Sequence, residues 1–146
     1  MKSHEGMVKY MNILIVDAQG GGVGKQLVAA VKDAMPEAKI IAVGANSMAT
    51  SQMLKAGADE AATGENPVVV ACRKADVIMG PIGIAIADSM NGEITPTMAT
   101  AIGQSDARRI LIPLNTCSNI VAGVQDKNLK TLIMDAVKYL KDDCAK

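Results

Sequence analysis

The chain has 146 residues, of which 15 are acidic and 15 are basic, and it is 49% hydrophobic but only 1% aromatic. Such a length predicts one domain, and the lack of a basic stripe argues against a nucleic-acid partner. No apolar run approaches the roughly 20 residues that a membrane-spanning helix requires, so we expect no membrane segment. Without Phe or Trp, the core must consist of aliphatic side chains and methionine. Their short continuous runs favour a parallel sheet covered by helices on both faces.

Three cysteines and one histidine limit the chemistry of the chain. The cysteines are Cys72, Cys117 and Cys144. They follow neither a disulfide nor a metal-ligand spacing, so we predict a reducing, cytoplasmic location and no metal site. The histidine, His4, lies in residues 1–10, which we interpret as an N-terminal extension or an expression remnant before a domain of residues 11–146.

The first half of the domain alternates strands with helices. Leu27, Val28 and Val31 recur at helical spacing after a glycine-rich loop, and Asn46 or Ser47 is the expected N-cap of the next helix. The predicted elements are a strand over residues 12–17, a helix over 23–35, a strand over 39–44, a helix over 46–57 and a short edge strand over 59–63.

The second half begins with the segment "ENPVVVACRKA", where three valines favour a strand. Asn66 as an N-cap and Pro67 at the first helical position favour a helix, which is our interpretation. Thr95 with Pro96, and later Asp126, are expected to cap two more helices. The predicted elements are a helix over residues 65–75, a strand over 76–80, a helix over 81–92, a helix from 96, a strand over 109–114, an antiparallel edge strand over 119–124 and a helix from 127.

Strands that alternate with helices along a chain form a parallel, doubly wound sheet. We therefore predict an α/β fold with a single, mostly parallel Rossmann-like sheet flanked by helices. The strand order 3-2-1-4-5 fits best, with the first strand at the centre and the antiparallel strand at one edge.

A glycine-rich loop, "DAQGGGVGK" at residues 17–25, follows the first predicted strand and precedes the first helix. This arrangement offers backbone N–H groups and a helix N-terminus to an anion, and glycine lets a phosphate approach closely. A tight turn that lets the helix pack on the sheet is the alternative interpretation of the same residues.

The loop departs from two phosphate-binding patterns. A Walker loop reads G-x-x-x-x-G-K-[ST], but Gln19 stands at its first glycine and Gln26 at the hydroxyl that binds magnesium. No later predicted strand ends in aspartate, so we expect no magnesium-dependent hydrolysis of nucleoside triphosphates. The dinucleotide pattern G-x-G-x-x-G also fails, and the acidic residue expected ~20 positions on, at the end of the second strand, is absent. Asn46 and Ser47 stand there and could bind a ribose hydroxyl or a phosphate.

Four polar or glycine-rich segments follow strands that end at the same edge of a parallel sheet, which is where ligands of such folds bind. Their convergence predicts a ligand site at this edge, whereas the carboxylates of Asp88 and Glu93 are expected to face solvent. The candidate site residues are Asp17, Gln19, Gly20, Gly21, Gly22, Gly24, Lys25, Asn46, Ser47, Gly80, Pro81, Asn115 and Cys117.

Four longer stretches, "DAQGGGVGK", "ATGENPVVV", "GPIGIAIADSMNGEITP" and "ILIPLNTC", resemble a small bacterial family known only as a domain of unknown function. The resemblance runs from Met11 to Leu140. It implies a Rossmann-like domain, and it implies no reaction, substrate or cofactor.

The leading interpretation is a binding protein for a phosphate-bearing small molecule, such as a nucleotide, at the glycine loop. A small enzyme that uses Asp17, Lys25 or Cys117 on such a ligand is the first alternative, and the lack of a histidine in the folded body favours the binder. A ligand-free structural or regulatory oligomer is the second. The apolar surplus, above all in "PIGIAIADSM" at residues 81–90, predicts a two-fold dimer through that segment.

Overall fold

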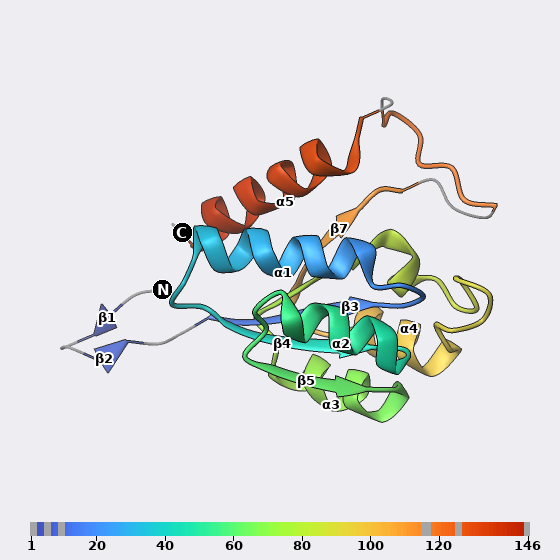
Figure 1. The fold of residues 1–146 in the computed structure, drawn as a ribbon, viewed down its shortest axis with the longest axis horizontal. Coiled ribbons are helices and arrows are strands. Elements are labelled where there is room, and N and C mark those ends of the chain that lie inside the picture. Colours follow the sequence, from blue (N-terminus) through green and yellow to red (C-terminus); the bar gives the residue numbers. More distant parts are fainter. Residues whose placement is uncertain (1–2, 5–6, 9–10, 115–117, 125–126, 145–146) are drawn as a thin grey trace.

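The computed structural model describes residues 3–4, 7–8, 11–114, 118–124 and 127–144 (Figure 1). The strands are β1 (Ser3–His4), β2 (Met7–Val8), β3 (Asn12–Asp17), β4 (Lys39–Gly44), β5 (Glu60–Thr63), β6 (Val77–Pro81) and β7 (Arg108–Ile112). The helices are α1 (Gly22–Ala34), α2 (Ser47–Lys55), α3 (Glu65–Lys74), α4 (Pro96–Gln104) and α5 (Leu129–Cys144), with a 3₁₀ helix, η1, over Ile82–Ala85. Within these ranges, no helix combines the length and the apolar character needed to cross a membrane.

Five strands form one parallel sheet in the order β5-β4-β3-β6-β7. The central strand, β3, pairs with β4 over its whole length, so that Asn12 lies opposite Lys39 and Asp17 opposite Gly44. On its other side β3 pairs with β6. Counted along the chain from β3, this is the order 3-2-1-4-5, and the predicted α/β class and strand order are confirmed. The strands β1 and β2 pair only with each other, as a hairpin that projects from the body (Figure 1).

The side chains of β3 alternate between two cores. Ile13 and Ile15 pack in the core that α1, α2 and α5 cover, and Leu14 and Val16 pack in the core beneath α3, α4 and η1. All four side chains are at most 1% exposed. A strand buried on both faces must be apolar at every position, which explains the continuous run in the sequence. Figure 1 shows α1 and α5 on one side of the sheet and α3 and α4 on the other.

Two helices begin at the capping residues that the sequence predicted. Asn46 Oδ1 accepts the N–H of Ala49 at 2.8 Å at the start of α2, and Thr95 Oγ1 accepts the N–H of Met98 at 3.1 Å at the start of α4. Pro96 is the first residue of α4, where its missing N–H costs no helical hydrogen bond.

Helix α3 exists as predicted, but its predicted cap is wrong. The helix begins at Glu65, and Gly64 with a φ of +108° is its N-cap, so Asn66 lies inside the first turn. Pro67 is the third helical residue rather than the first. It is tolerated there because the first N–H groups of a helix have no carbonyl partner within the helix.

The segment after β6 is not the helix that the sequence predicted. It begins with the single turn η1 and continues as turns until α4. Asp88, Met90 and Asn91 have φ angles between 56° and 65°, a left-handed conformation that interrupts a right-handed helix. The N–H of Asp88 donates to the carbonyl of Ile94 at 2.7 Å, which closes the segment into a compact loop.

The predicted antiparallel edge strand over residues 119–124 is also wrong, since in the described part of the chain the larger sheet ends at β7. A turn at Gly123, where φ is +83°, replaces the strand. Asn128 Oδ1 accepts the N–H of Thr131 at 2.8 Å and so caps the first turn of α5. The predicted cap, Asp126, lies outside the described residues.

The apolar segment at residues 81–90 lies mostly inside the protomer. Ile84 has an exposed fraction of 0%, and both Ile84 and Met90 belong to the core beneath α3 and α4. A dimer surface centred on Ile84 is therefore wrong, because the side chain is not available to a second copy. Self-association itself stays a prediction.

Ile84→Ala should lower the free energy of unfolding by about 2–5 kcal/mol, because it leaves a cavity in a packed core. Urea denaturation measures this change. Ile120→Ala is the matched control, since the Ile120 side chain is 85% exposed and its removal should have little effect. Equal unfolding midpoints for the two variants would contradict the burial of Ile84.

Candidate ligand-binding site

Strands β3 and β4 end side by side at the carboxyl edge of the sheet, where Asp17 lies opposite Gly44. The glycine loop leads from β3 into α1, and Asn46 follows β4 and caps α2. Both turns lie at the same end of the molecule as the loop between η1 and α4 (Figure 1). The loops after β3 and β4 and the segment before α4 therefore lie together at this edge, whereas the fourth expected segment includes residues 115–117, which lie outside the described ranges.

Asp17 holds the glycine loop from the inside. Its side chain is 3% exposed, its Oδ1 accepts the N–H of Ala18 at 2.8 Å, and its Oδ2 accepts the N–H of Gly24 at 2.7 Å. Gly24 lies in the first turn of α1, whose N–H groups have no partner within the helix. Asp17 thus takes one of the donors that a phosphate would use at this helix N-terminus.

Two of the loop glycines are required by the protein itself. Gly21 has a φ of +74°, and an added Cβ would lie 2.8 Å from Ala49 Cα in α2. At Gly24 an added Cβ would lie 2.6 Å from Met53 Sδ and 2.9 Å from Asp17 Cβ. Gly24 therefore lets α1 pack closely on the end of β3 and on α2, and Gly21 lets the loop approach α2.

Gly20 and Gly22 have no comparable internal role. Both are exposed, an added Cβ at either would meet no atom within 4 Å, and neither has a left-handed φ. Their N–H groups form no hydrogen bond with any described residue. Gly22 is the first residue of α1, and glycine is a poorer helix former than alanine by roughly 1 kcal/mol. Neither packing nor φ therefore requires glycine at these two positions.

A carboxylate from a distant part of the chain lies beside the glycine loop. Oε1 of Glu93 accepts the N–H of Gln19 at 3.0 Å and the side-chain amide of Asn46 at 2.7 Å. Asn46 also donates to the carbonyl of Gln19 at 2.9 Å, so both of its amide hydrogens are used within the protein. These bonds tie the loops after β3 and β4 to the segment before α4.

This role of Glu93 is not predictable from the sequence. The residue was expected in solvent, at the end of a predicted helix, but it is half-buried in the loop that replaces that helix. It lies 74 residues from Gln19 in the sequence, and no spacing pattern relates the two. Only the folded arrangement of the loop before α4 brings them together.

The other predicted site residues differ in their access to this edge. Lys25 and Ser47 are exposed in the first turns of α1 and α2. Gly80 and Pro81 are buried at the end of β6. The remaining predicted residues lie outside the described ranges, namely Asn115 and Cys117.

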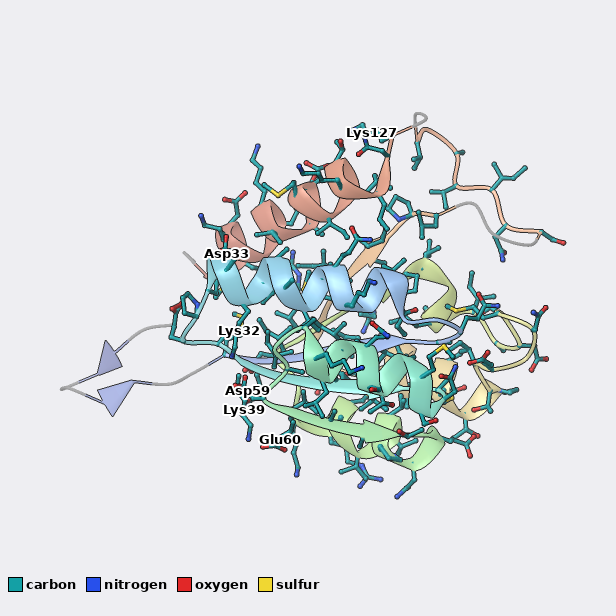
Figure 2. All side chains as sticks on the ribbon, in the orientation of Figure 1. Lys32, Asp33, Lys39, Asp59, Glu60 and Lys127 are labelled. Atoms are coloured by element: carbon teal, nitrogen blue, oxygen red, sulfur yellow. The ribbon has the colours of Figure 1, made fainter. Side chains whose placement is uncertain are left out.

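Lys25 forms no ion pair with any described side chain. Two lysines at the opposite edge of the sheet are paired: Figure 2 shows Lys32 beside Asp59 and Lys39 beside Glu60. The nitrogen–oxygen distances are 2.8 Å and 2.7 Å. Lys25 is therefore available as a positive charge in the first turn after the glycine loop.

A groove of about 730 Å³ lies between α3 and α4, and no residue of the glycine loop lines it. Cys72 and Arg73 line it from α3, and Thr100 lines it from α4. Burial raises the pKa of the Cys72 thiol to about 11. The thiol is therefore protonated at neutral pH and is a poor nucleophile.

The family model described as "Domain of unknown function (DUF3842)" matches residues 12–145. The chain belongs to this family. The match agrees with the expected family and names no activity. No curated protein matches the chain.

Among solved structures, the chain is similar to a nucleoside-diphosphate-sugar epimerase from Pseudomonas aeruginosa, with a TM-score of 0.46 and 11% sequence identity. The similarity covers 94% of this chain and 47% of the epimerase chain. The chain thus spans about half the length of that protein.

Asp17→Asn should lower the free energy of unfolding by about 1–3 kcal/mol, because its NH₂ group would face a backbone N–H in place of an acceptor oxygen. Chemical denaturation measures the change. Asp33→Asn is the control, because Asp33 is exposed on α1 (Figure 2). A loss of stability no larger than that of the control would show that Asp17 does not hold the loop.

The stability contributed by Asp17 should fall as the pH rises. Burial raises the pKa of the Asp17 carboxyl above its ordinary value of 3.8, and the nearby Glu93 charge raises it further. The hydrogen bonds from the Gly24 and Ala18 N–H groups lower the pKa, but they do not cancel the rise. The folded chain therefore binds this proton more tightly than the unfolded chain, and the resulting stability is lost as the pH rises through the folded pKa. Wild-type protein should exceed Asp17→Asn in unfolding free energy by more at pH 3.8 than at neutral pH. A difference that grows with pH would contradict the raised pKa.

Proposed function

We propose that this protein binds a phosphate-bearing small molecule, a nucleotide, at the glycine loop, and does so in the cytoplasm. The observation that carries the proposal is a pair of exposed glycines with open space around them. Gly20 and Gly22 leave their N–H groups without a protein partner at positions where neither packing nor φ requires glycine. A phosphate accepts such N–H groups readily, and Lys25 supplies a positive charge in the same turn.

Asp17 limits where the phosphate can lie. Its carboxylate already accepts the N–H of Gly24 inside the loop, and a second anion close to it would be repelled. The phosphate therefore contacts the outer side of the loop, over Gly20 and Gly22, and does not lie on the axis of α1. Such a contact is shallow, so affinity must also depend on the sugar or the base of the ligand.

The same contacts support binding in preference to catalysis. A general base must come within hydrogen-bond reach of its substrate, whereas Asp17 is buried with both oxygens engaged. Cys117 lies outside the described residues. Of the three side chains predicted as catalytic candidates, Lys25 is thus the one that the described part of the chain presents at the surface.

Gly22→Ala should separate binding from folding. The space around Gly22 is open and the position is helical, so alanine should leave the free energy of unfolding unchanged or raise it by up to about 1 kcal/mol. The added methyl group should hinder the approach of phosphate to the N–H donors. We expect it to weaken the binding of both pyrophosphate and ADP by ~10-fold or more, measured by isothermal titration calorimetry.

Gly103→Ala is the matched control for this experiment. Gly103 is an exposed glycine with open space around it, and it lies at the end of α4 that leads to the opposite edge of the sheet. It should change stability in the same direction and leave both affinities as in wild type. If wild-type protein binds neither probe, or if Gly22→Ala binds both as wild type does, the proposed function is wrong.

A further inference from the structure

The end of the second parallel strand is where dinucleotide-binding folds place an acidic residue that accepts hydrogen bonds from the ribose. Here β4 ends at Gly44, and Ala45 and Asn46 follow it, so the sequence supplies no acid. The fold instead brings an acidic side chain to this position from a distant part of the sequence. Glu93, in the segment before α4, lies against Asn46 with 2.7 Å between Oε1 and the amide nitrogen.

The two carboxylate oxygens of Glu93 differ in their hydrogen bonding to the described residues. Oε1 accepts the hydrogen bonds from Gln19 and Asn46, whereas Oε2 forms no hydrogen bond with any described residue. The half-buried side chain is thus held in place by two bonds while one charged oxygen stays available as an acceptor. A carboxylate oriented in this way is suited to bind hydroxyl groups, which donate hydrogen bonds to it.

The position of this carboxylate also fits the order of groups in a nucleotide. Glu93 is bonded to Gln19, the residue immediately before Gly20, and so lies next to the proposed phosphate contact. A second phosphate at this point would be repelled by the Glu93 charge, whereas a sugar hydroxyl would be attracted. In a nucleotide, the group joined directly to the phosphate is the ribose.

From these contacts we infer that Glu93 binds the ribose of the nucleotide through Oε2 and makes the site selective for a free 2′-hydroxyl. This inference rests on the proposed function, because it assumes a nucleotide phosphate at the glycine loop. A 2′-deoxyribose loses a hydrogen bond to a charged acceptor, and a 2′-phosphate adds like charge beside Glu93.

Glu93→Gln tests this role with little disturbance of the fold. Glutamine keeps an oxygen for the bonds from Gln19 and Asn46 and replaces the free Oε2 by an NH₂ group, which is no acceptor. In calorimetry, wild-type protein should bind ADP ~10-fold or more tightly than 2′-deoxyADP, the value of one hydrogen bond to a charged group. The variant should lose this preference, gain affinity for adenosine 2′,5′-bisphosphate and bind pyrophosphate at least as tightly as wild type. Glu37→Gln, an exposed site in the turn between α1 and β4, should behave as wild type.

The outcomes distinguish this inference from the proposed function. If pyrophosphate and ADP bind but wild type does not distinguish ADP from 2′-deoxyADP, the role of Glu93 is wrong and the phosphate site stands. The same conclusion follows if Glu93→Gln keeps the wild-type preference. If neither pyrophosphate nor ADP binds, the proposed function is overturned and this inference with it.

Discussion

The carboxylate of Asp17 joins the end of the central strand to the first turn of α1, and the carboxyl edge of the sheet depends on this link. Removing a carboxylate from water is costly, and the N–H groups of Ala18 and Gly24 offset that cost. The link also dictates the composition of the loop. Gly24 can approach Asp17 and Met53 only without a Cβ, and Gly21 must take a left-handed φ against Ala49.

A second carboxylate completes the edge by the same physical means. Glu93 draws the segment before α4 onto the loops after β3 and β4 by accepting N–H groups of Gln19 and Asn46. Two acidic side chains can lie near one glycine loop because backbone and amide donors stabilise each of them. The positive charges of Lys32 and Lys39 are meanwhile paired at the opposite edge. In the described part of the chain, the carboxyl edge thus presents the N–H groups of Gly20 and Gly22, the ammonium group of Lys25 and Oε2 of Glu93.

The sequence predicted the features that depend on local pattern. The apolar run of β3, and the capping side chains of Asn46 and Thr95, have their effect within a few residues, so their signals survive in the sequence. The segment before α4 was mistaken for a helix because its shape depends on left-handed residues such as Asp88 and on the burial of Ile84 under α3 and α4. The place of Glu93 follows from that shape, and no local rule could reveal it. The order of the five strands could be predicted because right-handed crossovers leave few alternatives.

The sequence does not distinguish the glycines of the loop from one another, whereas their surroundings in the folded chain do. Gly21 and Gly24 are explained by contacts inside the protomer, so they carry no information about a ligand. Gly20 and Gly22 are not explained in this way, because both are exposed and an added Cβ at either would meet no atom within 4 Å. A site made of main-chain donors and one oriented carboxylate can recognise a phosphate beside a hydroxyl. Asp17 is buried within the loop with both oxygens engaged, so it is not a free base at the phosphate contact that we propose, and this favours binding over catalysis.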